Sequence, residues 1–203
     1  MRHNKLLLAT NNIAKVREYE SLLQGIPYEI VTLAEQGITT VVEEVGGSLE
    51  ENARLKATIL AAESQLLSLA DDSGLEVEAL GGEPGPLSAR YAGDGASDID
   101  KISYLLTRLK DVPRKKRAAR FRCVIAVATP DNKVEFCTGE CRGFITLAPM
   151  GEHGFGYDPI FYLPELGKTM AELPLEIKNQ VSHRGKAARK ARELLKKLSL
   201  PPE

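Results

Sequence analysis

The chain has few cysteines, and their number argues against a disulfide framework. Cys123, Cys137 and Cys141 are its three cysteines, an odd number that suits free thiols in a reducing cytoplasm. Cys137 and Cys141 could supply half of a zinc site, but the sequence has no second Cys/His pair and only three histidines. We therefore predict a cytoplasmic protein with neither disulfides nor zinc.

The chain also lacks a strong net charge and a long apolar run. A net charge of −1 is not the bulk basicity typical of nucleic-acid-binding proteins. Basic residues gather between Arg114 and Arg122, which we interpret as a solvated connector. No apolar run reaches the roughly 20 residues of a membrane-spanning helix. The short apolar stretch 5–9 passes at once into polar residues, so we interpret it as a first strand and not as a signal peptide. We expect no nucleic-acid partner and no membrane partner.

Size and composition favour one soluble folding unit. The chain has 203 residues, of which 43% are hydrophobic and 27% are charged, as in ordinary globular proteins. This length suits one large domain, or two lobes around a shared sheet. No stretch has the composition of a linker, and we find no internal repeat. Residues 1–203 are therefore expected to form a single domain.

The first third of the chain predicts alternating strands and helices. A strand over 5–9, a helix over 13–23 and a strand over 28–33 make the β-α-β opening of an α/β sheet. Ser48 and Glu51 match a capping box, so a second helix is expected to run to about residue 67. Its predicted core-facing residues share one helical face: Leu55, Ile59, Ala62 and Leu66.

The remainder continues the α/β pattern. Ser97 and Asp98 are expected to cap a helix that ends at Leu109. Residues 120–127 alternate as a strand does, and a turn at 130–132 leads into a second strand over 133–145. A short helix interrupted at Pro174 is expected over 168–178. The last helix is predicted over 182–198, with its buried stripe at Ala187, Ala191, Leu194 and Leu198.

Two adjacent carboxylates form the most informative feature of the sequence. Asp71 and Asp72 follow the apolar stretch 66–70, and Ser73 and Gly74 come directly after them. We interpret this pattern as a strand end followed by a turn. Acids in such a place can hold a hard divalent cation or take a proton from water. A plain surface turn is the alternative, because Asp, Ser and Gly are turn formers.

Two further blocks contain groups suited to phosphate and to metal. Thr10, Asn11 and Asn12 stand at a strand-to-helix junction, where backbone N–H groups and the helix dipole favour an anion, and Lys15 adds a positive charge. A plain helix cap with a solvated lysine is the alternative, and the glycine spacing of a Walker A loop is absent. The acidic pair at 43–44 offers a metal ligand beside Asp72, unless both glutamates are simply solvated.

Two blocks in the last third of the chain suit a planar base. Glycines on both sides of Phe155 leave room for a flat ring to stack on the phenyl group, and Asp158 can accept hydrogen bonds. A glycine-rich turn with a core phenylalanine is the alternative. The donors at 178–179 and 182–184 suit a carbonyl-bearing base or a phosphate, unless they only cap a helix. A serine hydrolase is not indicated, because no G-x-S-x-G elbow is present.

Taken together and in this order, the blocks resemble the inosine/xanthosine triphosphate pyrophosphatase family. The resemblance spans nearly the whole chain, through the segments ATNNIAK, SLEENARLKA, ADDSGLEVEALGGEPGPLSARYAG, GFGYDPIF, KTMAEL and SHR. It implies an α/β fold with a long mixed β-sheet flanked by helices, and two lobes with a central substrate cleft. It also implies a homodimer and Mg²⁺-dependent hydrolysis of ITP, dITP and XTP to the monophosphate and pyrophosphate.

The resemblance also implies a role for individual residues. It makes Asp72 the proton acceptor and a magnesium ligand, and it assigns Glu44 or its neighbour Glu43 to the metal. The substrate-binding residues that it implies are Thr10, Asn11, Asn12, Ile13, Ala14 and Lys15 for the triphosphate, with Ser73, Phe155, Gly156, Tyr157, Asp158, Lys178, His183 and Arg184 around the rest of the nucleotide. Many family members have glycine where this chain has Ala14. A pyrophosphatase for other modified nucleotides and a nucleotide sensor without turnover are the competing hypotheses.

Overall fold

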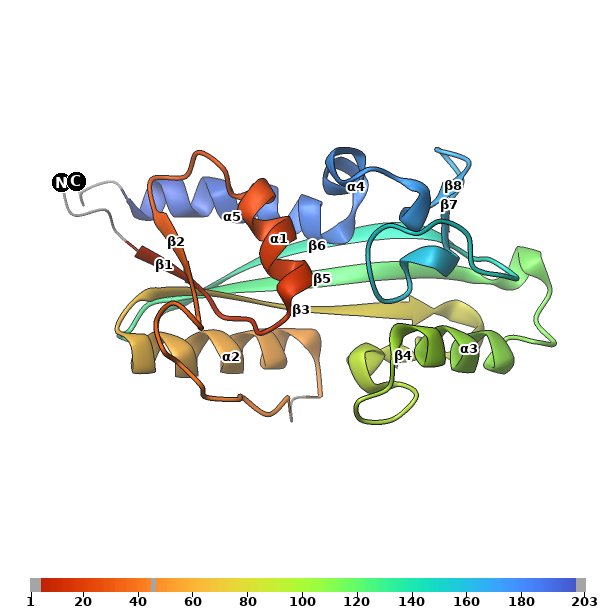
Figure 1. Cartoon of the computed structure of the whole chain (residues 1–203), viewed down its shortest axis with the longest axis horizontal. Helices are drawn as coiled ribbons and strands as arrows, with labels where there is room; N and C mark the ends of the chain where they lie inside the picture. Colours follow the sequence, from red (N-terminus) through yellow and green to blue (C-terminus); the bar gives the residue numbers. More distant parts are fainter. Residues whose placement is uncertain (1–4, 45–46, 200–203) are drawn as a thin grey trace. The chain divides into compact units, whose positions relative to one another are not determined.

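The computed structural model describes residues 5–44 and 47–199, which form one mixed sheet and the helices that pack on it (Figure 1). The sheet has eight strands in the order β2-β1-β3-β5-β6-β7-β8, with β4 paired to β3. The strands are β1 (Lys5–Leu8), β2 (Glu29–Thr32), β3 (Leu67–Val77), β4 (Pro84–Gly85), β5 (Ala118–Ala128), β6 (Val134–Ile145), β7 (Phe161–Leu163) and β8 (Lys168–Thr169). The α-helices are α1 (Ile13–Leu22), α2 (Leu49–Ser64), α3 (Asp98–Arg108), α4 (Leu175–Val181) and α5 (His183–Leu198).

The sheet is mixed, as the sequence predicts. β1 runs parallel to β2 and β3, whereas β4, β7 and β8 each run antiparallel to a neighbour. The chain divides into two compact units, which correspond to the two expected lobes. The first combines the chain up to residue 72 with 123–139 and the part from 184 on, and the second combines 73–122 with 140–183.

In the first unit, helices cover both faces of the sheet. α1 and α5 pack on one face around Leu6, Leu8 and Leu69, and α2 packs on the other around Leu7 and Val124 (Figure 1). The helices begin where their caps predict. The Asn12 side chain accepts hydrogen bonds at the start of α1, and the Ser48 side chain does so at the start of α2.

The second unit has its own core. α3 begins with a complete capping box between Ser97 and Asp100, and its Ile102 and Leu105 pack in a cluster that includes Phe121 of β5. Arg117 lies within the predicted solvated connector but is buried, and its guanidinium donates to the carbonyl oxygens of three residues: Leu109, Val112 and Thr146. Its charge therefore supports the end of α3 instead of an external partner.

Several sequence-based expectations were wrong in detail. β3 does not end at the acidic pair but continues to Val77, because residues beyond the pair stay buried in the sheet. The segment 168–178 is not an interrupted helix. It forms β8 and a 3₁₀ turn capped by Thr169, and Pro174 is the N-cap of α4. In α5, Leu195 is buried in place of Leu198.

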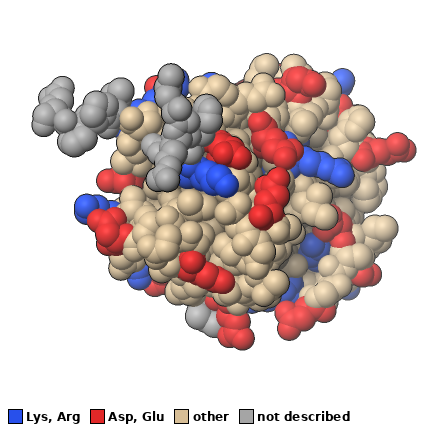
Figure 2. Space-filling view, turned by 60° about the vertical axis from the view of Figure 1, so that its left-hand side comes forward, with Lys and Arg blue, Asp and Glu red and all other residues tan. Residues whose placement is uncertain are grey.

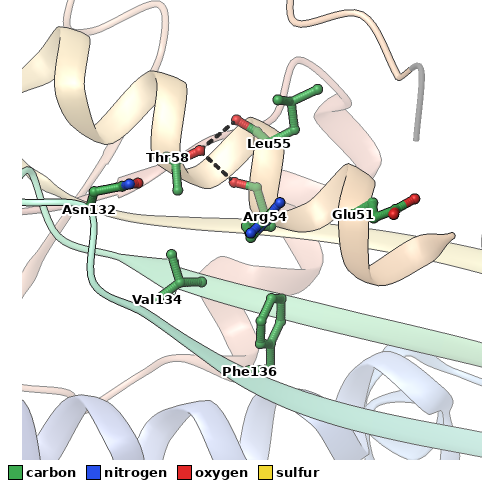
Figure 3. A pocket seen from close by; sticks show the side chains of 7 residues that line it. All are labelled: Glu51, Arg54, Leu55, Thr58, Asn132, Val134 and Phe136. Carbon is green, nitrogen blue, oxygen red and sulfur yellow. Dashed lines mark hydrogen bonds between the residues drawn. The ribbon is translucent and has the colours of Figure 1, made fainter. Parts of the chain in front are cut away.

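The core-facing side of α2 also differs from the predicted one. Its buried residues are Leu49, Asn52, Ala53, Ala57, Leu60 and Ala61, whereas Ile59 is exposed. Leu55 instead lines a groove of about 630 Å³ between α2 and β6 (Figure 3). The small alanines let the helix approach the sheet closely, so the larger apolar residues were a poor guide to the buried face.

The surface carries charges of both signs. In the view of Figure 2, acidic and basic side chains are interspersed among uncharged residues. No helix within residues 5–44 and 47–199 is both long and apolar enough to cross a membrane.

Candidate active site

The segment between β1 and α1 presents its polar side chains at a helix start. The Asn12 side chain accepts hydrogen bonds from the backbone N–H groups of Ala14 (2.9 Å) and Lys15 (3.2 Å), and Thr10 Oγ1 accepts from Asn12 N (3.2 Å). Asn11, Asn12 and Ile13 are exposed. Ala14 occupies the second position of α1, so this turn accommodates its methyl group.

Asp71 belongs to a buried cluster on the α1 and α5 side of the sheet. Its Oδ1 lies 2.9 Å from Lys15 Nζ, and its Oδ2 lies 3.2 Å from Arg184 Nε. The Cys123 thiol is 3.8 Å from the same Oδ2. Burial would raise the pKa of the Asp71 carboxyl, but Lys15 and Arg184 outweigh it and hold this pKa well below its usual range. Asp71 is therefore a permanently charged partner for two cations.

Asp72 is held by α2. Asn52 Nδ2 donates to Asp72 Oδ2 at 3.1 Å, and Lys56 Nζ lies 3.3 Å from Oδ1. Burial raises the pKa of the Asp72 carboxyl above its usual value; Lys56 opposes that rise, and Glu44 adds to it. A raised pKa makes a carboxylate a better proton acceptor, because catalytic pKa values serve best near the working pH.

Glu44 and Asp72 meet at one cation. Lys56 Nζ lies 2.7 Å from Glu44 Oε1, so the two carboxylates share the Lys56 ammonium, whereas Glu43 is exposed. Carboxylate oxygens are the ligands that Mg²⁺ prefers, and it needs only one or two of them beside water and substrate oxygens. These residues therefore fit a magnesium ion. Across the described part of the chain, no group of three or more His, Cys, Asp or Glu side chains forms a metal cage.

A second cluster, around Asp158, lies in the second unit. Asp158 Oδ2 accepts from Lys178 Nζ at 2.6 Å and from Phe155 N at 2.9 Å, and the Lys178 ammonium lies 4.8 Å from the centre of the Phe155 ring. Gly154 has a φ of +78°, and a Cβ there would overlap the Asp158 carboxylate. The loop thus joins an aromatic ring and a buried cation in a fixed geometry.

The other predicted residues of this unit differ in burial. Tyr157 is buried and donates to the backbone oxygen of Ser88 at 2.9 Å, so its side chain supports the core. Gly156 N donates to Asp98 Oδ2 at 2.6 Å. His183, at the start of α5, is buried and stacks on Phe121 with a centroid distance of 4.6 Å. Ser73 is half-buried in β3.

Among the residues that contact these groups but were not predicted as site residues, Glu18, Asn52 and Lys56 make charged or polar contacts in the first unit. Glu18 pairs with Arg184 Nη1 at 2.8 Å, and Asn52 and Lys56 hold Asp72. Their spacing was the available signal. Lys15 and Glu18 are three apart on α1, and Asn52 and Lys56 are four apart on α2, so each pair shares a helix face.

Residues 6–194 match the Ham1 family. The chain belongs to this family. It is 49% identical over 199 residues to the dITP/XTP pyrophosphatase of Desulforamulus reducens, covering 98% of this chain and 99% of that one. It is 48% identical over 196 residues to the dITP/XTP pyrophosphatase of Thermus thermophilus, covering 97% of this chain and 94% of that one.

Solved Ham1 structures show the same fold. The Staphylococcus aureus Ham1 protein matches with a TM-score of 0.86 and 41% identity, over 97% of this chain and all of that one (100%). A HAM1 protein from Coxiella burnetii matches with a TM-score of 0.87 and 38% identity, over 96% of this chain and 99% of that one. Ham1 membership confirms the family resemblance and the α/β fold predicted from the sequence.

Proposed function

We propose that this chain hydrolyses the non-standard purine triphosphates ITP, dITP and XTP to the monophosphate and pyrophosphate. The observation that carries the proposal is Asp72. It is a buried carboxylate with a raised pKa, fixed by Asn52 and Lys56 in the same unit as Lys15. The relatives named dITP/XTP pyrophosphatase, 49% and 48% identical over nearly their full length, support the same reaction.

In the proposed reaction, Asp72 takes a proton from water as the water oxygen attacks a phosphorus of the triphosphate. The bond to the bridging oxygen breaks, and pyrophosphate leaves with the bonding electrons. Lys15 and the N-terminus of α1 bind the triphosphate and offset its negative charge. Glu44 and Asp72 would hold Mg²⁺, which neutralises developing charge on the phosphate oxygens when bound.

Base selection is assigned to the remaining predicted residues. Phe155 offers a ring for stacking, and Lys178 and Arg184 offer donors to the carbonyl at C6 of hypoxanthine or xanthine, where adenine carries an amino group. Ser73, Gly156, Asp158 and His183 complete the proposed set. Because the Ham1 match spans residues 6–194, we propose that residues 1–203 work as one catalytic domain.

Assembly and location are part of the proposal. Homodimer formation is expected from the family resemblance, and light scattering that returns the 22.2 kDa monomer mass at micromolar concentration would reject it. The three cysteines are free thiols, which supports a reducing cytoplasm. A panel of dITP, modified pyrimidine triphosphates and standard triphosphates, with pyrophosphate release as the readout, tests the function against the competing hypotheses.

A further inference from the structure

The first unit contains a buried row of four alternating charges: Lys15, Asp71, Arg184 and Glu18. Lys15 Nζ lies 2.9 Å from Asp71 Oδ1, Arg184 Nε lies 3.2 Å from Asp71 Oδ2, and Arg184 Nη1 lies 2.8 Å from Glu18 Oε2. The two positive and two negative charges cancel. The row joins α1, β3 and α5 on the side of the sheet opposite α2, to which Asp72 is bound.

Asp71 contacts both cations of the row. Its side chain is fully buried, whereas 14% of the Lys15 side chain remains exposed. The Lys15 side chain therefore has a buried carboxylate at its ammonium and keeps part of its surface exposed. Any phosphate that binds Lys15 must share this ammonium with Asp71.

We propose that Asp71 is a charge-balancing residue that limits how tightly Lys15 holds phosphate, and so permits release of the pyrophosphate product. The inference rests on the proposed function, in which Lys15 binds the triphosphate. A negative charge about 3 Å from Lys15 subtracts from the attraction of the ammonium for a further anion. Product release limits the turnover of many enzymes, so a Lys15 ammonium without a neighbouring carboxylate would slow the reaction.

The test is the affinity for inorganic pyrophosphate, measured by calorimetry and as product inhibition. Asp71→Asn keeps the shape and one acceptor oxygen but removes one negative charge. The dissociation constant of pyrophosphate is expected to fall about tenfold, because a unit charge is lost close to the anion in a partly screened environment. The kcat and KM for ITP are expected to fall together, as slower product release requires.

Glu18→Gln is the matched control. It removes the same charge from the same row, but at the end that pairs with Arg184 and not at Lys15. The dissociation constant of pyrophosphate is therefore expected to fall by less than about threefold, against about tenfold for Asp71→Asn. Equal or larger tightening by Glu18→Gln would overturn the specific role of Asp71, because it would show that only the total charge matters.

Lys15→Ala separates this inference from the proposed function. If Lys15→Ala leaves pyrophosphate affinity unchanged, the triphosphate assignment of Lys15 is wrong and the inference is overturned with it. If Lys15→Ala weakens binding while Asp71→Asn weakens it or leaves it unchanged, the charge-balancing role alone is overturned. A purely structural Asp71 would not tighten anion binding when it is replaced.

Asp71→Asn leaves two buried cations with one anion and can fail to fold. In that case the comparison is made in an Arg184→Met background, where Asp71→Asn leaves the neutral pair of Lys15 and Glu18. It is made at a low temperature at which circular dichroism shows both proteins to be folded despite the stability lost with Arg184. The double variant is expected to bind pyrophosphate several-fold more tightly than Arg184→Met alone. Equal or weaker binding by the double variant contradicts the proposal.

Discussion

Asp71 and Asp72 are neighbours in sequence, but they have different surroundings. Successive side chains of a strand point to opposite faces, so Asp71 meets the cations of α1 and α5 while Asp72 meets α2. The pKa of Asp71 is held below its usual range by its cations, whereas burial raises that of Asp72. The sequence predicted the importance of the pair. Their different partners on opposite faces of the sheet were not predicted, because the pair was assigned to the end of a strand and not to its interior.

Replacing Asp72 with asparagine is expected to reduce ITP hydrolysis by at least about 100-fold while the fold survives. The amide has the same shape but cannot accept the proton from water, and general-base catalysis contributes roughly 10²–10⁴-fold. Turnover with Mg²⁺ is compared with that of Asp94→Asn, which changes an exposed aspartate. A rate near that of the wild type, from a folded Asp72→Asn protein, would show that Asp72 is not the base.

Arg184→Met is expected to destabilise the protein. The change leaves Glu18 buried without its arginine and removes one of the two cations at Asp71, and breaking a buried ion pair costs about 3–5 kcal/mol. Arg189→Met, at an exposed position of the same helix, should change the free energy of unfolding by no more than about 0.5 kcal/mol. Denaturant unfolding of the two variants measures the difference; similar values would exclude a structural role for the Arg184 pairs.

At the level of elements, local signals predicted where most helices and strands begin. Asn12, Ser48 and Ser97 each cap the helix expected after them, and the alternation of 120–127 identified β5. The orientation of α2 was not predictable in the same way. Its large apolar residues and its alanines define different faces, and only packing on the sheet selects the alanine face.

This orientation predicts losses of stability of different size for two substitutions in α2. Ala57 is fully buried against the sheet, so Ala57→Leu is expected to lower the free energy of unfolding by about 1–3 kcal/mol through overpacking. Ile59 is 39% exposed, so Ile59→Ser should have a smaller effect. Chemical denaturation gives both values. A larger loss in the free energy of unfolding for Ile59→Ser than for Ala57→Leu would show that the helix face predicted from the sequence is the buried one.

For the cluster around Asp158, the sequence indicated which residues matter but not which of them are in contact. The glycines around Phe155 and the donor Lys178 were identified, yet the segment before Lys178 was predicted as one interrupted helix. Thr169 caps a short 3₁₀ turn and Pro174 starts a new helix, which places Lys178 on α4 beside Asp158. Such a contact between separate segments has no local sequence signal.

At the level of the whole molecule, the long-range arrangement could not be predicted from local patterns, and the expectations for it came from the family resemblance. The charge row links Glu18 and Arg184, which are 166 residues apart in the chain, and no periodicity relates them. The α/β class, the mixed sheet and the two units agree with expectation. The central cleft and the homodimer stay predictions.

Stability is expected to fall in alkaline solution. Burial raises the pKa of Tyr19 well above its usual value, with Asp71 adding to the effect, and burial also raises that of Tyr157. The unfolded tyrosines lose protons above about pH 10, whereas the folded ones keep them. The stabilising contribution is therefore complete below pH 10 and is lost as the pH rises further. Denaturant unfolding at pH 8 and pH 10.5 tests this, and equal stabilities would contradict it.

The proposed activity is the selective hydrolysis of non-standard purine triphosphates with release of pyrophosphate. The most direct measurement is kcat/KM for dITP beside dATP and dGTP, with Mg²⁺ present and both products quantified. We expect a preference for dITP of roughly 100-fold or more, since a site built around specific hydrogen bonds strongly rejects the wrong partner. We also expect one pyrophosphate for each dIMP. Equal hydrolysis of the three triphosphates, or release of single phosphates, would contradict the proposed activity.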